Sequence, residues 1–538
     1  MENNKNELIA DYVIVGAGSA GCVLASRLTE DPSCKVILIE AGGSDKNLIV
    51  QMPSAFYLPM QSKTLNWGYV AEPEPNMDGR RLDCPRGRVM GGSSSINGMV
   101  YVRGNANDYQ RWEKMGAKGW SYSEVLPYFK KAQRADKRTT EDEFKGHDGP
   151  VGTTSGALKN PLYNYFLAAA EEAGHPLNDD FNGQHQEGFG VMPMTVADGI
   201  RSSTVRSYLP RKRSNLKIIK KAMVHKILIN EGKAEGVSFA AKAKTKTKTY
   251  QAFANKEVLV CAGAINSPQL LMLSGIGPKD HLSEMGISVN ADVPGVGQNL
   301  MDHLEVYVQQ SITKPLSLYK DLSLLGRAKI GLEWLLTQRG LGATNHFEVG
   351  GYIRSHPAAV QPDIQFHFLP AAMSYDGSSQ ASGHGCQAHV GPMLSPSRGI
   401  VRLKSSNPLD YPAIKFNYMS HPSDWEVFRA AIRGAREIFS QPAFDAIRGP
   451  EFNPGAQAQT DKELDAFVRA HAESAYHPCG TCKMGVDDMS VVDPAGRVHQ
   501  IGNLRVIDSS IFPHITNGNL NAPTIMVAEK MADMIKSA

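Results

Sequence analysis

A glycine-rich turn between two apolar runs narrows most strongly what this chain can fold into. The run at residues 12–15, YVIV, is short, apolar and rich in β-branched residues, as in a buried strand of a parallel sheet. Gly16, Gly18 and Gly21 follow in G-x-G-x-x-G spacing, which permits a tight turn, a close approach of backbone to a pyrophosphate, and close packing of helix on strand. The next apolar run, KVILIEAG, contains Glu40 at its end, and this carboxylate can accept hydrogen bonds from ribose hydroxyls. The order predicts a dinucleotide site and leaves NAD and FAD as alternatives, while a glycine-rich turn in an unrelated α/β protein is the structural alternative.

The length and composition are those of an ordinary globular chain with more than one domain. The chain has 538 residues, of which 42% are hydrophobic and 21% charged. The net charge of +3 is small for this length and gives no argument for nucleic acid as a partner. The seven cysteines are too scattered for a disulfide scaffold and indicate reduced thiols.

The hydropathy of the chain gives no sign of a signal peptide or a membrane-spanning segment. The beginning, MENNKNELIADY, lacks a basic segment followed by an apolar one. No apolar stretch reaches the roughly 20 residues that cross a bilayer. We therefore expect a cytoplasmic protein, with peripheral attachment to the inner face of the cell membrane as a second interpretation.

The segment YHPCGTCKMG, residues 476–485, allows two interpretations. Cys479 and Cys482 form a Cys-x-x-Cys pair that a zinc or redox protein could use. A structural zinc site usually needs four ligands, and the chain has no second such pair. His477 has an unperturbed pKa near working pH and suits a proton acceptor, although a single histidine is more often structural. We predict no metal site, and we expect the cysteines to pack around a loop that positions His477.

A glycine- and serine-rich loop occupies residues 85–112, PRGRVMGGSSSINGMVYVRGNANDYQRW. Small residues and free backbone N–H groups suit close contact with a phosphate or a ring system, whereas a flexible loop is the structural alternative. The loop runs into the apolar stretch SINGMVYV, which favours a packed segment.

Several segments together resemble the glucose–methanol–choline (GMC) family of flavoprotein oxidoreductases. Residues 85–112 resemble its first signature, and residues 263–277, GAINSPQLLMLSGIG, resemble its second. YHPCGTCKMG and GNLNAPTIMVAEKMADMI are similar to its C-terminal catalytic segments, so that the resemblance covers essentially the whole chain. Within the family, NWGYVAEPEPNMDGRRLDCPRGRVMGG, GATNHFEVGGYIRS, LSPSRGIVRLKS and NYMSHPSDWEVFR are most similar to bacterial members that oxidise choline.

The resemblance implies an α/β fold (α+β overall) with a Rossmann-like FAD-binding domain and a second, substrate-binding domain built on an antiparallel sheet. The flavin-binding segments come from distant parts of the chain and must converge on one cofactor. The predicted FAD-binding domain is therefore discontinuous and comprises residues 1–159, 201–311 and 465–538. The predicted substrate-binding domain comprises residues 160–200 and 312–464.

The resemblance also implies FAD, held without a covalent bond. Some members of the family tether FAD through a histidine in the GGSSSIN stretch, where this chain has Ile96, which has no nucleophilic atom. Asp508 ends a short apolar strand, NLRVID, and an acid there can bind cofactor hydroxyls. The predicted cofactor-binding residues are Gly16, Gly18, Ser19, Gly21, Glu40, Ala41, Gly91, Gly92, Ser95, Asn97, Gly98, Met99, Val100, Val224, Ala262, Asp508, Asn519, Pro523 and Thr524.

The catalytic assignment follows from two matched motifs. Oxidation of an alcohol removes a hydride from carbon and a proton from oxygen; flavin N5 takes the hydride, and the protein must supply a proton acceptor. His477 matches the family's catalytic histidine and is predicted to be the base. Asn521 matches the family's second active-site position, and its amide is predicted to donate a hydrogen bond to the substrate oxygen.

The substrate is predicted from two further residues that match the family. The resemblance puts Glu348 and Phe347 at the substrate, where a carboxylate and an aromatic face would hold a quaternary ammonium group. A glutamate that is solvated or salt-bridged in a loop is the structural alternative. The predicted reaction is choline to betaine aldehyde, as in glycine betaine synthesis. Another primary alcohol, aliphatic or polyether, is the main alternative, and a flavin-binding protein without catalysis is a further one.

The partners beyond the substrate are less constrained. The likeness to choline-oxidising dehydrogenases favours a quinone or another carrier as electron acceptor over oxygen, and the oligomeric state stays open. Lysines 242, 244, 246 and 248 alternate with small residues, as on one face of a strand. They could touch anionic lipid headgroups, but we favour a hairpin edge that the lysines protect from pairing with another chain.

Overall fold

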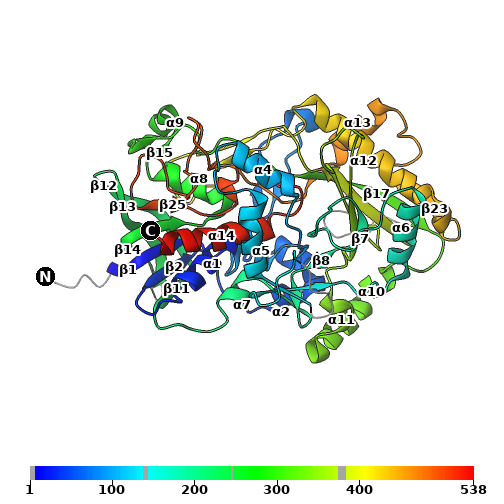
Figure 1. Cartoon of the computed structure of the whole chain (residues 1–538), viewed down its shortest axis with the longest axis horizontal. Coiled ribbons are helices and arrows are strands. Elements are labelled where there is room, and N and C mark those ends of the chain that lie inside the picture. Colours follow the sequence, from blue (N-terminus) through cyan, green and yellow to red (C-terminus); the bar gives the residue numbers. More distant parts are fainter. Residues whose placement is uncertain (1–6, 137–142, 244–245, 374–382) are drawn as a thin grey trace.

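Two seven-stranded sheets lie at opposite ends of an elongated molecule (Figure 1). The structure is a computed structural model and describes residues 7–136, 143–243, 246–373 and 383–538. The first sheet carries the glycine-rich turn, and the second is flanked by the helices α6 (Pro161–Glu172), α12 (Pro422–Ser440) and α13 (Asp461–His471).

The first sheet joins a parallel part to an antiparallel hairpin. Its order is β11-β2-β1-β14-β13-β12, and β25 pairs with the end of β14. The parallel strands confirm the prediction of a Rossmann-like domain, and β12 and β13 extend the sheet in antiparallel fashion. The bounds are β1 Glu7–Val15, β2 Val36–Glu40, β11 Leu216–Lys220, β12 Ala222–Asn230, β13 Lys233–Ala243, β14 Lys246–Val260 and β25 Leu504–Val506.

The spacing of the glycines after β1 is required by close packing. Gly16 has a φ of +96°, and a Cβ atom there would lie 2.5 Å from the carbonyl oxygen of Cys261. A Cβ atom at Gly21 would lie 1.9 Å from the carbonyl oxygen of Gly16. A side chain at Gly21 would push α1 (Ser19–Leu28) away from the end of β1, and one at Gly16 would push the turn away from the end of β14.

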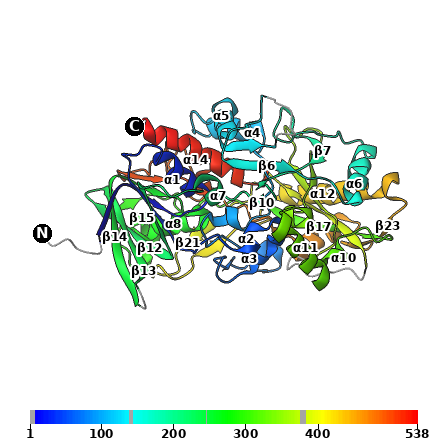
Figure 2. The same ribbon diagram turned by 90° about the horizontal axis from the view of Figure 1, so that it is seen from below.

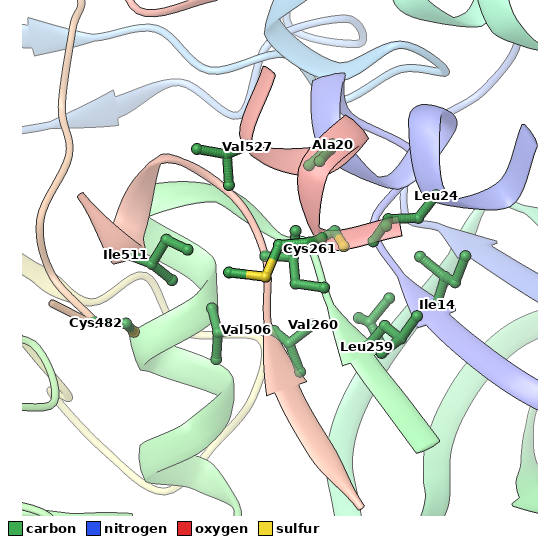
Figure 3. Packing of buried hydrophobic residues seen from close by; sticks show 14 of the residues in the cluster. Ile14, Ala20, Leu24, Leu259, Val260, Cys261, Cys482, Val506, Ile511 and Val527 are labelled. Atoms are coloured by element: carbon green, nitrogen blue, oxygen red, sulfur yellow. The ribbon is translucent and has the colours of Figure 1, made fainter. Parts of the chain in front are cut away.

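The core around this turn joins segments that are far apart in the sequence. Figure 3 shows side chains of β1, β14 and β25, among them Ile14, Leu259 and Val506, in one buried cluster with α1 and α14 (Asn521–Lys536). The two helices pack side by side (Figure 2), and the guanidinium of Arg27 lies 2.7 Å from the fully buried carboxylate of Glu529. The last helix is thus an integral part of the nucleotide-binding fold.

The second sheet is antiparallel, as predicted. Its order is β23-β17-β20-β19-β18-β7, with β24 paired to the start of β17. The bounds are β7 Gly188–Val191, β17 Leu304–Ile312, β18 Val349–Ile353, β19 Ile364–Leu369, β20 Gly385–Pro392, β23 Arg448–Asn453 and β24 Glu473–Ser474.

Residues of this sheet alternate between two different environments. Val306, Phe366 and Val390 are fully buried with side chains of α12 (Pro422–Ser440) and α6 (Pro161–Glu172). α12 buries Phe428, Ile432 and Ile438 on one face, whereas Trp425 is only partly buried. The other face of the sheet carries polar and aromatic residues and is described below.

The predicted domain limits remain a proposal. One of them, at residue 311, coincides with strand β17. This strand begins at Leu304 and belongs to the second sheet, so the limit predicted at residue 311 falls within a strand rather than between the sheets. β7, within residues 160–200, joins the same sheet as β18–β20, within residues 312–464.

The remaining elements form the connections and covering layers. The other helices are α2 Leu48–Gln51, α3 Tyr57–Gln61, α4 Ala106–Lys114, α5 Tyr122–Ala132, α7 Thr204–Tyr208, α8 Gly263–Leu273, α9 Lys279–Glu284, α10 Tyr319–Leu322, α11 Leu324–Thr337 and α13 Asp461–His471, with 3-10 turns at Pro53–Ala55, Pro75–Met77, Gly92–Ser95, Gly340–Ala343, Pro442–Phe444 and Ser509–Ile511. The short strands are β3 Tyr69–Val70, β4 Asp83–Cys84, β5 Gln133–Ala135, β6 Val151–Ser155, β8 Pro193–Met194, β9 Val196–Ala197, β10 Ile200–Arg201, β15 Ile276–Gly277, β16 Ala291–Asp292, β21 Ile400–Arg402 and β22 Ala413–Lys415.

Of the alternating lysines, Lys242 lies on β13, and Lys246 and Lys248 lie on β14. Lys242 and Lys248 are exposed, Lys244 lies outside the described residues, and the side chain of Lys246 is likewise not described. The pairing of β13 with β14 here extends beyond the part of β14 that β1 covers. Among the described residues, no helix has both the length and the apolarity to cross a membrane.

Candidate active site

A cavity of about 690 Å³ connects the two halves of the molecule. At one end it is lined by Gly16, Glu40 and Cys261, at the carboxyl ends of parallel strands β1, β2 and β14. At the other end it reaches the face of the second sheet that carries Tyr307 and His389. The ends of parallel strands are where α/β proteins bind nucleotides, so the two ends suit a cofactor and a substrate.

Glu40 is held in place at the nucleotide end. Its two carboxylate oxygens accept hydrogen bonds from the backbone N–H groups of Ala17 (2.9 Å) and Gly42 (2.7 Å). Burial raises the pKa of Glu40 to about 7. Glu40 thus ties the end of β2 to the glycine turn, and it lines the cavity.

Most of the predicted cofactor residues line the cavity, and four do not. Gly21, Gly91, Ser95 and Pro523 lie outside it; the Ser95 hydroxyl, for example, donates to the carbonyl of Met90 (2.7 Å). These positions support the loop and helices that form the wall. The predicted residues that line the cavity are Gly16, Gly18, Ser19, Glu40, Ala41, Gly92, Asn97, Gly98, Met99, Val100, Val224, Ala262, Asp508, Asn519 and Thr524.

Asp508 is oriented by three donors at the end of β25. One oxygen accepts from the Gly263 N–H (2.8 Å) and the Ser267 hydroxyl (2.6 Å), and the other accepts from the Ser510 N–H (2.8 Å). This network ties the start of α8 to the segment that follows β25. The carboxylate lines the cavity near the glycine turn.

His477 is fixed at its backbone and at both ring nitrogens. Its N–H donates to the Asp302 carboxylate (2.6 Å), Nδ1 lies 3.0 Å from Nδ1 of His303, and Nε2 lies 3.0 Å from Nδ2 of Asn519. Burial, with the neighbouring His303, lowers the pKa of His477 well below its ordinary value. A neutral imidazole in the cavity is available to accept a proton.

The structure exchanges the positions that we predicted for two asparagines. Asn519, predicted to contact the cofactor, lies at His477, whereas the Asn521 side chain accepts a hydrogen bond from the Ser19 hydroxyl at the glycine turn (2.7 Å). Leu520 occupies the position just before α14, and the two asparagines on either side of it point to different parts of the cavity. The amide that meets His477 is therefore that of Asn519 and not that of Asn521.

Cys479 and Cys482 are buried packing residues with free thiols. Both are fully buried, and burial raises the pKa of each thiol well above its ordinary value. The backbone of Cys479 exchanges two hydrogen bonds with Met301, and Cys482 lies in the core shown in Figure 3. The pair thus anchors the loop on which His477 stands. Within the described residues, no three His, Cys, Asp or Glu side chains are grouped so that they could hold a metal ion.

Glu348 does not face the cavity, which contradicts its predicted role. Its carboxylate accepts hydrogen bonds from the Leu158 N–H (2.8 Å) and the Thr344 hydroxyl (2.7 Å) and is buried among these loops. The neighbouring Phe347 does line the cavity. Glu348 therefore ties loops together as a buried, hydrogen-bonded acid, rather than as the solvated or salt-bridged one of the structural alternative.

Glu305 is the acid that sequence reasoning missed. It lines the cavity, and its carboxylate lies 2.9 Å from Nδ1 of His389. Burial alone would raise the pKa of Glu305, but the neighbouring His389 outweighs burial and holds it below its ordinary value. A carboxylate at this position is ionised at neutral pH.

A row of aromatic side chains surrounds Glu305. Tyr307 and His389 are paired across β17 and β20, and His389 and His367 across β20 and β19. The ring centroids of Phe347 and His389 are 5.3 Å apart, and those of Tyr307 and His389 are 4.0 Å apart. The sequence DHLEVYV carried the signal, because His303, Glu305 and Tyr307 alternate with apolar residues as on one face of a strand.

The comparisons with known proteins agree along the whole chain. Models of the GMC oxidoreductase family match residues 10–305 and 395–528. The chain is 54% identical over 530 residues to the oxygen-dependent choline dehydrogenase of Sinorhizobium medicae, and this match covers 98% of this chain and 95% of that protein. It is 53% identical, with the same coverage, to the protein of the same name from Brucella canis.

Solved structures agree with the sequence relatives. Pyridoxine 4-oxidase from Mesorbium loti is 30% identical with a TM-score of 0.89, and the match covers 98% of this chain and 99% of that one. A variant of formate oxidase from Aspergillus oryzae RIB40 is 27% identical with a TM-score of 0.92, and the match covers 98% of each chain. The glycine-rich turn, the cavity closed by an antiparallel sheet and the similarity to these relatives lead to one conclusion. The chain belongs to the GMC oxidoreductase family.

Proposed function

We propose that this protein is an FAD-dependent alcohol dehydrogenase that oxidises choline to betaine aldehyde. The observation that carries the proposal is the ionised Glu305, placed beside aromatic rings in the cavity that also contains His477. The curated relatives at 53–54% identity are named choline dehydrogenases, which supports the same substrate.

The nucleotide end of the cavity fits FAD. A Cβ atom at Gly16 or Gly21 would clash with the backbone, and one at Gly92 would lie 2.7 Å from the Cα atom of Gly18. A Cβ atom at Gly98 would meet nothing within 4 Å, so the space beside this residue is open. The glycine turn and the start of α1 would hold the pyrophosphate, and Glu40 would accept from the ribose. Bound FAD supplies the acceptor for the hydride that leaves the alcohol carbon.

The protein's own residues handle the proton. An alcohol oxygen that binds beside Asn519 and His477 would replace their direct 3.0 Å contact: it can accept from the amide Nδ2 while its hydroxyl donates to Nε2 of His477. His477 then takes the proton as the O–H bond breaks, and the amide stabilises the developing negative charge on oxygen.

The far end of the cavity suits a quaternary ammonium group. Such a group has no proton to donate and is held by a carboxylate and by aromatic faces. Glu305, Tyr307 and Phe347 provide these features, and all three line the cavity. A neutral alcohol would gain nothing from the carboxylate.

FAD is expected to be held without a covalent bond through residue 96. Ile96 lines the cavity, is almost fully buried, and packs with Val50, Leu65 and Val89. Acid precipitation of the holoenzyme should therefore release all the flavin into the filtrate, where its absorbance measures the yield. A yellow pellet over a colourless filtrate would contradict this.

The deciding test is anaerobic reduction of the bound flavin. Choline should bleach the flavin absorbance with a higher second-order rate constant than a panel of neutral primary alcohols. Faster bleaching by an aliphatic or polyether alcohol would favour that substrate instead, and no bleaching by any alcohol would indicate flavin binding without catalysis. Mixing the reduced enzyme with oxygen or with a soluble quinone then identifies the electron acceptor, which we propose to be a quinone or another carrier.

Peripheral attachment to a membrane is supported by one surface helix. α11 exposes Leu324 (86%), Leu325 (86%) and Leu336 (77%), whereas Trp334 of the same helix lines the cavity. The exposed basic residues Lys320, Arg327 and Lys329 flank these leucines. Apolar residues rimmed by basic ones are typical of segments that lie on anionic bilayers.

This attachment predicts co-sedimentation with vesicles that contain phosphatidylglycerol. The double variant Leu324→Ser/Leu325→Ser should lower the partition coefficient at least about tenfold, because two apolar side chains lose their burial in lipid. Val360→Ser, which changes another residue that is 83% exposed, is the matched control and should leave partitioning unchanged. Equal sedimentation of the parent and the double variant would overturn the assignment to α11.

A further inference from the structure

The contacts of His303 determine which of its nitrogens carries a proton. The imidazole is fully buried, and its Nε2 lies 3.0 Å from the carbonyl oxygen of Met393. A carbonyl oxygen can only accept a hydrogen bond, so Nε2 of His303 must carry the hydrogen. In the neutral ring Nδ1 is then a bare acceptor, and burial lowers the pKa of His303 to about 3, which keeps the ring neutral.

The bare nitrogen of His303 faces His477. Its Nδ1 lies 3.0 Å from Nδ1 of His477, and two bare nitrogens at that distance would repel each other. The hydrogen between the rings must therefore sit on Nδ1 of His477. A neutral His477 with its hydrogen on Nδ1 carries its lone pair on Nε2.

The opposite side of His477 leads independently to the same tautomer. Asn519 Oδ1 lies 3.3 Å from Nε2 of Gln365, which also donates to the Tyr352 hydroxyl (2.6 Å). This contact turns the Nδ2 group of Asn519 toward Nε2 of His477, at 3.0 Å. An amide N–H donates, so Nε2 of His477 must be the acceptor.

We propose that His303 is a positioning residue that keeps the hydrogen of His477 on Nδ1 and its lone pair on Nε2, facing the alcohol. This inference rests on the proposed role of His477 as the base. A histidine in the other tautomer would present an N–H to the substrate hydroxyl and could not take its proton. When the hydroxyl proton moves to Nε2, Nδ1–H still donates to His303, so the new imidazolium keeps its partner.

The backbone on both sides of His303 makes this geometry rigid. His303 directly precedes β17 and Met393 directly follows β20, and the two strands pair from Val306 with Val390 onward. The preceding residue, Asp302, accepts the backbone N–H of His477. Asp302 thus holds the backbone of His477, and its neighbour His303 holds the ring of His477.

The matched variants His303→Asn and His303→Leu test this role. The two side chains have the same branched shape, and both lose the bond to Met393. Only asparagine offers an oxygen near the position of Nδ1, where it can accept from Nδ1–H of His477. Both variants are prepared as FAD-loaded holoenzyme, with flavin content checked before kinetics.

We expect His303→Leu to lower kcat for choline at least about 10²-fold, since a wrong tautomer at a catalytic histidine can cost up to about 10⁴-fold. KM should change less than about threefold, because His303 does not touch the substrate. His303→Asn should recover kcat to within about tenfold of the parent. Equal loss in both variants, or an undiminished rate in His303→Leu, would overturn the proposal.

A spectroscopic measurement separates this inference from the proposed function. In the parent holoenzyme labelled with ¹⁵N-histidine, Nε2 of His477 should give the resonance of an unprotonated ring nitrogen and Nδ1 that of a protonated one. The signals are assigned by their loss in His477→Gln. The opposite pattern would refute the role of His303 even if choline is oxidised, and the predicted pattern would support it even if choline is not the substrate.

Discussion

His477→Ala is expected to slow anaerobic flavin reduction by choline about 10²–10⁴-fold, the usual loss when a general base is removed. The imidazole is the one group at the Asn519 end of the cavity that we assign to take the hydroxyl proton, and alanine offers no acceptor there. Flavin content should stay equal to that of the parent, because no predicted contact of His477 holds the nucleotide end. Rapid-mixing absorbance measures the rate, and denatured extracts measure the flavin.

The control for this variant is His471→Ala, which changes an exposed histidine at the end of α13. It should reduce its flavin at the parent rate. An unchanged rate in His477→Ala would remove His477 from the mechanism, whatever the role of its neighbours.

Glu305→Gln is expected to lower kcat/KM for choline on the order of 10²-fold, since removal of one member of a buried charge pair costs about 2–5 kcal/mol. The amide keeps the size of the side chain but loses the charge that would face the ammonium group. The uncharged analogue of choline, in which carbon replaces the quaternary nitrogen, should be oxidised by this variant and the parent within about threefold. Steady-state kinetics with the two alcohols give the charge selectivity directly.

Glu348→Gln is the matched comparison for Glu305→Gln. Glu348 is bonded to Leu158 and Thr344 away from the cavity, so its variant should lose stability without losing charge selectivity. A loss of selectivity in Glu348→Gln, with none in Glu305→Gln, would restore the assignment made from the sequence.

The local parts of the fold could be predicted because their signals are local. A Cβ atom at Gly21 would clash with Gly16 within one strand-turn-helix unit, and α12 carries its buried face in its own spacing. The antiparallel second sheet was predicted from the family resemblance and is present. The domain limit proposed at residue 311 falls inside β17, because the extent of this strand depends on pairing with β20 and β24, which are distant in the sequence.

The candidate site could be predicted only where one residue has a distinctive chemistry. His477 fits the role from sequence, but Asn519 and Asn521 have the same side chain two residues apart, and only the three-dimensional direction of each tells them apart. Glu305 and Glu348 both stand in apolar strand-like sequences. Alternation shows which residues share a face, but it does not show which face a cavity will meet.

The contact between α1 and α14 has a consequence for how the protein is made. Ser19 meets Asn521, and Arg27 meets Glu529, so one wall of the nucleotide pocket is synthesised about 500 residues after the other. On a ribosome that adds on the order of 5–20 residues per second, α14 is synthesised tens of seconds after the glycine turn. During that interval the face of α1 that packs on α14 is uncovered. FAD can therefore enter its complete site only near the end of translation.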